Sequence, residues 1–196
     1  IEAGVEIGPD TTIEPGVYLK GQTTIGSNVT IGMGSVITDS QIADDVTIIS
    51  SHITEATVGQ YSDIGPNSRL RKGAILEDNV HIGNYVEVKN ATLKSGVKAG
   101  HHAYIGDATI GERVNVSCGV IFANYDGINK HHSVIEADVF IGSNVTIVSP
   151  VTVQAGAFLA AGSTINQDVA ADALAIARSR QENKADYVKN LPASKK

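Results

Sequence analysis

The sequence predicts an all-β protein in which short parallel strands wind into a solenoid. Aliphatic residues recur every six positions from Ile1 to Ile165, often with a glycine next and a small or β-branched residue four positions later. Ile25-Gly-Ser-Asn-Val-Thr and Ile141-Gly-Ser-Asn-Val-Thr are two clear copies. A period of six is neither the 3.6 of a helix nor the simple alternation of a long strand, but it fits short inward-facing strands separated by turns. An antiparallel sandwich, with turn signals every 8 to 12 residues, does not share this period.

The repeat continues for about 28 positions, with few irregularities. Five-residue steps replace six-residue steps between 37 and 42, 48 and 53, 53 and 58, 88 and 93, and 105 and 110. The one long interruption lies between Phe122 and Ile135 and contains Asn124-Tyr-Asp-Gly-Ile-Asn-Lys130, which we expect to be extruded as a loop. With three strands per coil and about 4.8 Å per coil, the solenoid should have about nine coils and be roughly 40 Å long.

The repeat stops after Val169, which divides the chain into a β-helical domain at 1–169 and an arm at 170–196. The alanine-rich segment from Ala170 predicts a helix that continues to Val188. We expect Pro192 to end the ordered part and 194–196 to be frayed.

Composition narrows the functional classes. The 196-residue chain is long enough for one substantial domain, and its net charge of −6 disfavours nucleic acid as a partner. Residues 69–98 nevertheless carry six basic against three acidic side chains, which fits a small anionic ligand. A single cysteine favours a reducing compartment such as the cytoplasm, and no apolar run is long enough for membrane insertion. Because Ile1 already sits on the repeat, the chain looks like a fragment of a longer protein.

One stretch, Lys98-Ala-Gly-His-His-Ala-Tyr-Ile-Gly-Asp107, keeps the repeat but introduces two imidazoles and a phenol where neighbouring repeats carry small or charged residues. Other strings occur in fixed order around it. They are Arg69-Leu-Arg-Lys-Gly73, His81-Ile-Gly-Asn-Tyr-Val-Glu-Val-Lys-Asn90, the 124–130 loop and Ala173-Leu-Ala-Ile-Ala-Arg178. A rigid repeat with a histidine at one turn and a loop close by in sequence suggests a site built on a rod.

Together these strings resemble the C-terminal domain of the bifunctional N-acetylglucosamine-1-phosphate uridyltransferase/glucosamine-1-phosphate N-acetyltransferase family. The resemblance covers essentially the whole chain and implies a left-handed parallel β-helix of hexapeptide repeats. It also implies a cytoplasmic homotrimer, with sites between subunits, that transfers acetyl from acetyl-CoA to the amine of glucosamine-1-phosphate. The product feeds UDP-N-acetylglucosamine synthesis, and hence peptidoglycan, the cell wall and cell shape. Acetyl transfer should need no metal; magnesium is expected only for the uridyltransferase domain, no part of which is recognisable in this chain.

The resemblance also assigns roles to individual residues. His101 takes the position of the general base, which the chemistry needs because a sugar ammonium must lose a proton before it attacks a thioester. His102 is interpreted as a neighbour of that base. The substrate-binding positions are Arg71, Lys89, Tyr104, Asn115 and Lys130. The acetyl-CoA positions are Cys118, Asn124, Tyr125, Ser143, Ala161 and Arg178.

Three departures from the family pattern are visible. Cys118 replaces an alanine at a turn that contacts CoA, Lys72 replaces a proline, and Asn144 replaces an aspartate. None removes a group that the mechanism requires. The alternatives are another hexapeptide-repeat acyltransferase, a β-helical zinc carbonic anhydrase, or a non-catalytic trimerising rod. The six histidines show no recognisable zinc signature, although a trimer could assemble ligands across subunits.

Overall fold

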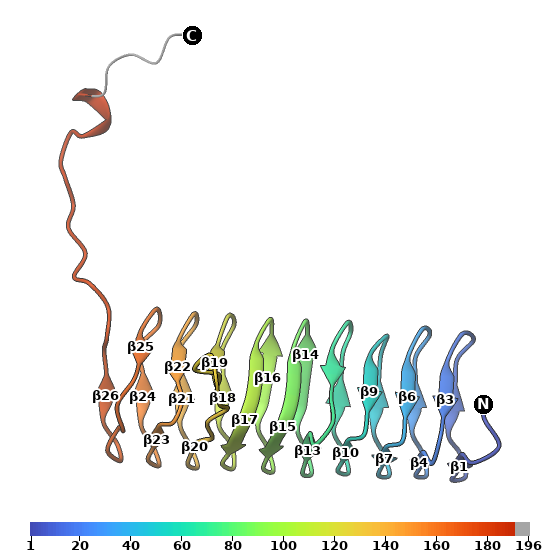
Figure 1. Cartoon of the computed structure of the whole chain (residues 1–196). Coiled ribbons are helices and arrows are strands. Elements are labelled where there is room, and N and C mark those ends of the chain that lie inside the picture. The colour runs from blue at the N-terminus through green and yellow to red at the C-terminus, as the bar shows by residue number, and fades with distance from the viewer. Residues whose placement is uncertain (191–196) are drawn as a thin grey trace.

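The computed structural model describes residues 1–190, which form a straight three-sided rod of stacked coils with an extended segment at its C-terminal end (Figure 1). All pairings between named strands are parallel, and each strand pairs with the equivalent strand one coil away. One face has ten strands, so the rod has ten coils rather than the expected nine. The predicted all-β parallel solenoid is confirmed.

The strands lie on three faces, each named here after one of its members. The β16 face contains β2 (Thr12–Ile13), β5 (Thr30–Ile31), β8 (Thr47–Ile48), β11 (Asp63–Ile64), β14 (His81–Asn84), β16 (Lys98–His101), β18 (Asn115–Val116), β21 (Phe140–Ile141), β24 (Phe158–Leu159) and β26 (Leu174–Ala175). The β19 face contains β3 (Tyr18–Lys20), β6 (Val36–Thr38), β9 (His52–Thr54), β12 (Arg69–Leu70), β19 (Ile121–Ala123), β22 (Thr146–Val148) and β25 (Thr164–Ile165).

The third face, named after β13, contains β1 (Glu6–Ile7), β4 (Thr24–Ile25), β7 (Gln41–Ile42), β10 (Thr57–Val58), β13 (Ile75–Leu76), β20 (Ser133–Ile135) and β23 (Thr152–Val153). Two longer strands, β15 (Glu87–Leu93) and β17 (Tyr104–Ile110), run across the edge between the β19 and β13 faces. Two edges matter for function. The His101 corner separates the β16 and β19 faces, and the Asp107 corner separates the β19 and β13 faces.

The core is a single column formed by the residues of the six-residue repeat. The repeat is visible in the sequence because its aliphatic positions are the buried ones. Ile31, Ile48, Ile82 and Ile141 are fully buried on the β16 face, and equivalent residues from the other two faces meet them in the interior. Burying each such side chain stabilises the rod by roughly 1.5–3 kcal/mol. Ile1, at the N-terminal end of the described rod, is 73% exposed.

The predicted C-terminal helix is wrong for the described residues. Leu174 and Ala175 pair in parallel with Phe158 and Leu159, so the solenoid continues past Val169 by one more strand. The chain then extends away from the rod to a three-residue 3-10 turn, η1 (Val188–Asn190). The helix propensity of alanine is a small energy per residue, and strand pairing that packs Ala173 and Ala175 on the core outweighs it. The calls on Pro192 and on 194–196 lie outside the described residues.

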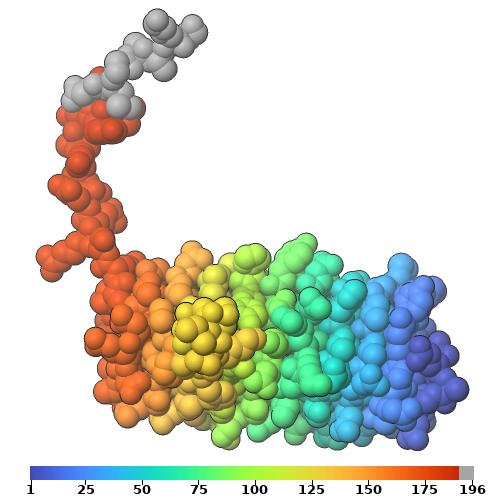
Figure 2. All heavy atoms as spheres, in the orientation of Figure 1, coloured from blue at the N-terminus to red at the C-terminus, as the bar shows by residue number. Residues whose placement is uncertain are grey.

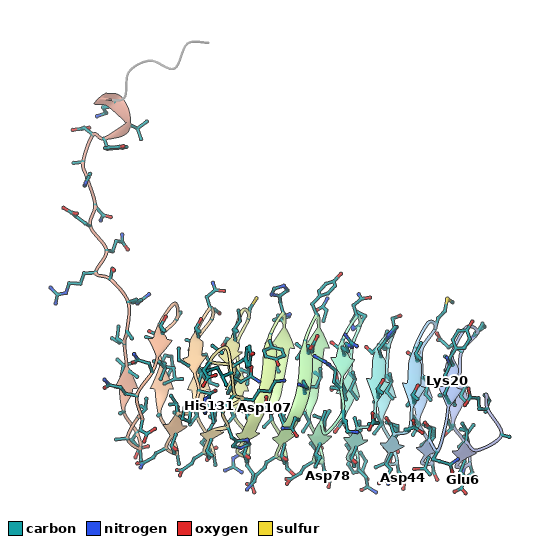
Figure 3. The ribbon with its side chains drawn as sticks, viewed as in Figure 1. Glu6, Lys20, Asp44, Asp78, Asp107 and His131 are labelled. Carbon is teal, nitrogen blue, oxygen red and sulfur yellow. The ribbon has the colours of Figure 1, made fainter. Side chains whose placement is uncertain are left out.

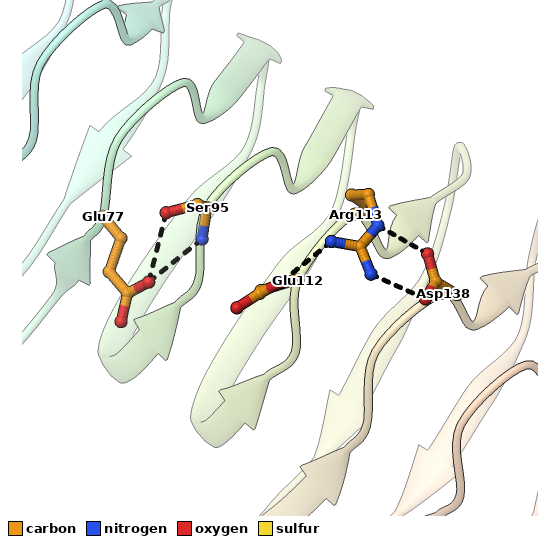
Figure 4. A network of polar contacts seen from close by, with 5 residues as sticks. All are labelled: Glu77, Ser95, Glu112, Arg113 and Asp138. Carbon is orange, nitrogen blue, oxygen red and sulfur yellow. Dashed lines mark hydrogen bonds and ion pairs between the residues drawn. The ribbon is translucent and has the colours of Figure 1, made fainter.

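Polar contacts at the edge between the β13 and β16 faces tie successive coils together. Arg113 makes a two-point ion pair with Asp138 at 2.7 and 2.8 Å and bonds to Glu112 at 2.8 Å (Figure 4). Hydrogen bonding to Arg113 lowers the pKa of Asp138. Elsewhere on this edge, Asp44 accepts the backbone N–H of Ser27 from the preceding coil, and Glu6, Asp44 and Asp78 lie along the same side of the rod (Figure 3). Much of the acidic charge of the first coils therefore caps turns.

Candidate active site

A shallow groove of about 400 Å³ runs beside the His101 corner on the β16 face. Its lining includes His81, Lys98, His101, Asn115, Cys118 and Ser143. His101 ends strand β16, and its side chain is exposed. The imidazole makes no side-chain hydrogen bond within residues 1–190, so both ring nitrogens can reach a bound molecule.

The predicted acetyl-CoA residues continue from this groove along the same corner, one coil after another. Backbone hydrogen bonds of 2.8–2.9 Å link the turns in this order: Gly119 to His102, Asn144 to Cys118, and Gly162 to Ser143. Ala161 lies directly beneath Gly142, and Arg178 approaches Gly162 from the last strand. Cys118, Ser143, Ala161 and Arg178 therefore form a row parallel to the rod axis, with the arginine at its far end.

The turn that follows His101 has left-handed backbone geometry. His102 has a φ of +40°, and the equivalent residues of the neighbouring coils, Tyr85 and Asn144, have φ values of +58° and +55°. His102 is consequently turned away from the groove and lines a separate hollow on the β19 face with Tyr85, Glu87, Tyr104 and Ile121. The two adjacent histidines therefore face different surfaces.

A second histidine of the groove has a fixed partner that sequence reasoning missed. His81 lies in register between Asp63 and Lys98 on the β16 face. Its Nδ1 is 2.6 Å from Asp63 Oδ2. A carboxylate in this position holds the imidazole in one orientation.

At the Asp107 corner, the structure brings together three of the predicted substrate residues: Arg71, Lys89 and Lys130. Arg71 and Lys89 come from consecutive coils of the β19 face, and Lys130 comes from the end of the extruded loop. Arg71 Nη1 is 2.8 Å from Glu87 Oε1, which fixes one side of the guanidinium and leaves its other N–H groups available. Glu87 was not singled out from the sequence.

The side chains of Lys89 and Lys130 lie within hydrogen-bonding reach of each other. The hydrogen bond with Lys130, then partial desolvation, then the charge of Lys130 lower the pKa of Lys89. The hydrogen bond with Lys89 raises the pKa of Lys130. The two ammonium groups concentrate positive charge at this corner, which a bound anion such as a phosphate would offset.

Asp107 and Asn124, both buried, join this cluster to the loop. Asn124 Nδ2 donates a hydrogen bond to Asp107 Oδ2 and lies 3.5 Å from Tyr104 Oη. Tyr104 thus shares its surroundings with Asn124, although the resemblance placed the two residues in different binding groups.

The loop itself is a small hairpin that stands out from the surface (Figure 2). Tyr125 and Lys130 form an antiparallel bridge at its base. Asp126 closes the tip: its Oδ2 is 2.7 Å from His131 Nε2, and its Oδ1 accepts the backbone N–H groups of Ile128 and Asn129 at 2.7 and 2.6 Å. These contacts position Lys130 and Asn124 at the two ends of the hairpin.

We expect the loop to loosen in acid with a midpoint set by Asp126. The hydrogen bond from His131, followed by those from the backbone of Asn129 and Ile128, lowers the pKa of Asp126 to about 2. Because the folded pKa is depressed, this contribution is present above the ordinary value of about 3.9 and is lost as the pH falls through about 2. Carboxyl ¹³C titration should give that midpoint in the wild type and a higher one in His131→Ala. Equal midpoints near 3.9 in both proteins would contradict the closed loop.

The predicted site residues therefore form two groups on the two edges of the β19 face. His101, Asn115, Cys118, Ser143, Ala161 and Arg178 follow the His101 corner; Arg71, Lys89, Asn124, Tyr125 and Lys130 gather at the Asp107 corner. Tyr104 lies on the face between them. Five residues separate His101 from Gly106, so their Cα atoms are at most about 18 Å apart. Within 1–190, no three metal-ligating side chains cluster, and no helix is long and apolar enough to cross a membrane.

Two family models match parts of the chain: the GMPPB C-terminal domain over residues 1–93, and the bacterial transferase hexapeptide (six repeats) over 132–167. Curated relatives match all of it. The bifunctional protein GlmU of Latilactobacillus sakei is 54% identical over 195 residues, which is 100% of this chain and 42% of that protein. The GlmU protein of Enterococcus faecalis is 52% identical, covering 100% of this chain and 43% of that protein. The chain thus spans about two fifths of the length of these relatives.

Among solved structures, LpxA, a UDP-N-acetylglucosamine acyltransferase from Bacteroides fragilis, superposes with a TM-score of 0.57. The match covers 81% of this chain and 66% of that chain, with 19% sequence identity. At this identity the likeness concerns the fold alone, and it agrees with the left-handed β-helix that the family resemblance implies.

Proposed function

We propose that this chain, which is related along its whole length to the C-terminal part of the bifunctional GlmU proteins, transfers acetyl from acetyl-CoA to the amine of glucosamine-1-phosphate. The observation that carries the proposal is that the two edges of the β19 face carry different chemical groups. A cluster of three cations lies at one edge, and an exposed imidazole with a row of small turns lies at the other. An acetyl donor bound along the His101 corner could then meet an acceptor whose anionic end is bound at the Asp107 corner.

Each group has a role in this reaction. Arg71, Lys89 and Lys130 bind the phosphate, with Arg71 contributing a directional fork and the lysines point charges. Tyr104 and Asn115 pair with sugar hydroxyls. His101 takes a proton from the sugar ammonium, and the free amine then attacks the thioester carbonyl. The carbon–sulfur bond breaks as the tetrahedral intermediate collapses, the second proton of the attacking nitrogen passes to the departing sulfur, and CoA leaves as the thiol.

Acetyl-CoA follows the row of turns along the His101 corner. Cys118, Ser143 and Ala161 offer small side chains and backbone groups to the extended pantetheine arm, and Arg178 meets its phosphates. Cys118 preserves this path because it is small and its backbone N–H and C=O are already set by the turn. Tyr125, exposed at the base of the loop, contacts acetyl-CoA bound to a neighbouring copy.

We propose that the active form is a homotrimer with its sites between subunits. Asn115 lies on the β16 face, whereas Arg71 and Lys89 lie at the far edge of the β19 face, at the Asp107 corner. In a homotrimer with sites between subunits, one bound sugar would contact the residues of one edge from one chain and those of the other edge from its neighbour. The extruded loop and the extended segment after β26 both reach outward, as such sharing requires.

The test is a thiol-release assay with several acceptors. Purified protein with acetyl-CoA should release CoA with glucosamine-1-phosphate at least tenfold faster, in kcat/KM, than with unphosphorylated glucosamine. N-acetylglucosamine-1-phosphate, which has the phosphate but no free amine, is the matched negative control. The rate should be unchanged by EDTA. Absence of release with every aminosugar, or equal rates with and without the phosphate, would overturn the assignment.

A further inference from the structure

Asp107 is the single charged residue that is buried within residues 1–190, at 7% exposed. Its position follows from the local sequence. The five-residue step from Ile105 to Ile110 leaves no room for a turn, so β17 runs across the corner with Asp107 at a φ of +48°. Aspartate tolerates this left-handed conformation better than most residues do. The same step from Val88 to Leu93 places Asn90, with a φ of +46°, directly alongside.

Both carboxylate oxygens of Asp107 are engaged. Asn90 Nδ2 donates to Oδ1 at 2.6 Å, and Asn124 Nδ2 donates to Oδ2. A buried carboxylate is costly unless hydrogen bonds and opposite charge compensate it. The opposite charge is supplied by Lys89 and Lys130, each of which interacts favourably with Asp107. Both carboxylate oxygens of Asp107 therefore act as hydrogen-bond acceptors, with two cationic side chains nearby.

An ionised carboxylate accepts hydrogen bonds and cannot donate them. Asn124 must consequently present its N–H₂ group to Asp107, and this fixes which way its amide lies. The amide oxygen then points away from Asp107, where it can accept a hydrogen bond from an amine. Without the carboxylate, the two orientations of the amide would differ much less in energy.

Gly106 provides the space for this arrangement. A Cβ on Gly106 would lie 2.5 Å from Tyr104 Oη and 2.7 Å from Asn124 Nδ2, both far inside contact distance. The hydroxyl and the amide therefore occupy the volume that any other residue would fill. Tyr104 and Asn124 therefore pack against Gly106, and Asn124 is also hydrogen-bonded to Asp107.

We propose that Asp107 is a positioning residue: it orients the amide of Asn124 so that Oδ1 holds the attacking amine of the acceptor sugar, while its charge balances the lysines of the phosphate site. This inference rests on the proposed function and extends it. Asp107 itself does not touch the substrate. It acts through Asn124, and that dependence can be measured.

The experiment is a double-mutant cycle with Asp107→Asn and Asn124→Ala. Asparagine keeps the size of aspartate and accepts a positive φ, so the fold should be preserved. We expect Asp107→Asn to lower kcat for glucosamine-1-phosphate by about 10- to 100-fold and to change KM for acetyl-CoA by less than about twofold. In the Asn124→Ala background, the same change should have little further effect. Asn90→Gly, which removes the other donor without backbone strain, is the matched control and should stay within about threefold of wild type.

The possible results distinguish a failure of the positioning role of Asp107 from a failure of the proposed acetyltransferase function. Additive losses in the cycle, or an Asp107→Asn enzyme as active as wild type, would overturn the positioning role while the acetyltransferase assignment stands. Failure of the wild type to acetylate any aminosugar phosphate would instead remove the assignment. If Asp107→Asn does not fold, the side-chain amide protons of Asn124 provide the test in the wild type. They should exchange at least tenfold more slowly than those of exposed Asn129, and equal rates would contradict the bond.

Discussion

Replacing His101 with alanine should lower kcat/KM for acetyl transfer by about 10²–10⁴-fold, the usual contribution of a positioned general base. The acceptor amine arrives largely as an ammonium ion, which has no lone pair for attack. No other described imidazole takes its place, because His81 is bound to Asp63 and His102 faces the neighbouring hollow. A steady-state assay with both substrates varied measures the loss.

The fold should tolerate the change. The side chain of His101 is exposed, and the core of its coil is formed by Ala99 and Ile105, both fully buried. The melting temperature and the affinity for CoA should therefore stay close to those of wild type.

The backbone conformation of His102 determines which substitution at that position can serve as the control. His102 has a φ of +40°, so alanine at this position would strain the turn, whereas asparagine adopts such a φ readily. His102→Asn should retain most of the activity. An inactive His102→Asn with an active His101→Ala would mean that the neighbour is the base. If both variants remain active, the base lies elsewhere and His81 becomes the first residue to test.

The repeat predicted most of the fold because it reports burial directly. Ile31, Ile82 and Ile141 were chosen from spacing alone, and each is completely buried. The prediction was wrong at the C-terminal end, where the six-residue repeat is no longer visible and the alanine-rich Ala173-Leu-Ala segment was interpreted as helix. A two-residue strand that pairs with Phe158 and Leu159 carries too few repeat residues for a period of six to be visible.

The candidate site was less predictable, because its contacts join residues one coil apart. Asn90 and Asp107 are separated by 17 positions, as are Asp107 and Asn124, and no local motif marks either pair. The five-residue steps contained a usable signal. Asp39, Glu55, Asn90 and Asp107 all lie two residues after the start of such a step and all have a positive φ. A polar residue two positions into a five-residue step therefore marks a shortened corner with left-handed backbone, and of these four residues Asp107 is the buried one.

Glu87 was missed for a different reason. The resemblance named the residue that binds a ligand, Arg71, but not the residue that holds it in place. Parallel pairing puts Arg69 opposite Glu87 and brings the Arg71 side chain across to its carboxylate. Coil stacking creates this pair, so it becomes visible only once the register is known.

Arg71→Ala should raise KM for glucosamine-1-phosphate by about 10- to 100-fold and leave KM for acetyl-CoA within about twofold. A charge-assisted hydrogen bond contributes roughly 1.5–3 kcal/mol, which corresponds to that range of affinity. Arg71 is fixed on one side by Glu87 at 2.8 Å, so little side-chain freedom is lost when its remaining N–H groups bind a phosphate. Lys89 and Lys130 keep part of the anion affinity, which prevents a larger loss. Initial rates measured over a matrix of both substrate concentrations give the two KM values.

Lys72→Ala is the matched control for charge, because Lys72 is one residue away but is paired with Glu55 at 2.6 Å rather than with the cluster. It should change either KM by less than about twofold. Arg178→Ala tests the other end of the site and should raise KM for acetyl-CoA while sparing the sugar phosphate. If Arg71→Ala weakens acetyl-CoA and Arg178→Ala weakens the sugar, the two ends have been assigned in reverse. If Lys72→Ala matches Arg71→Ala, the effect is only that of net charge, and the cation cluster at the Asp107 corner does not bind the phosphate.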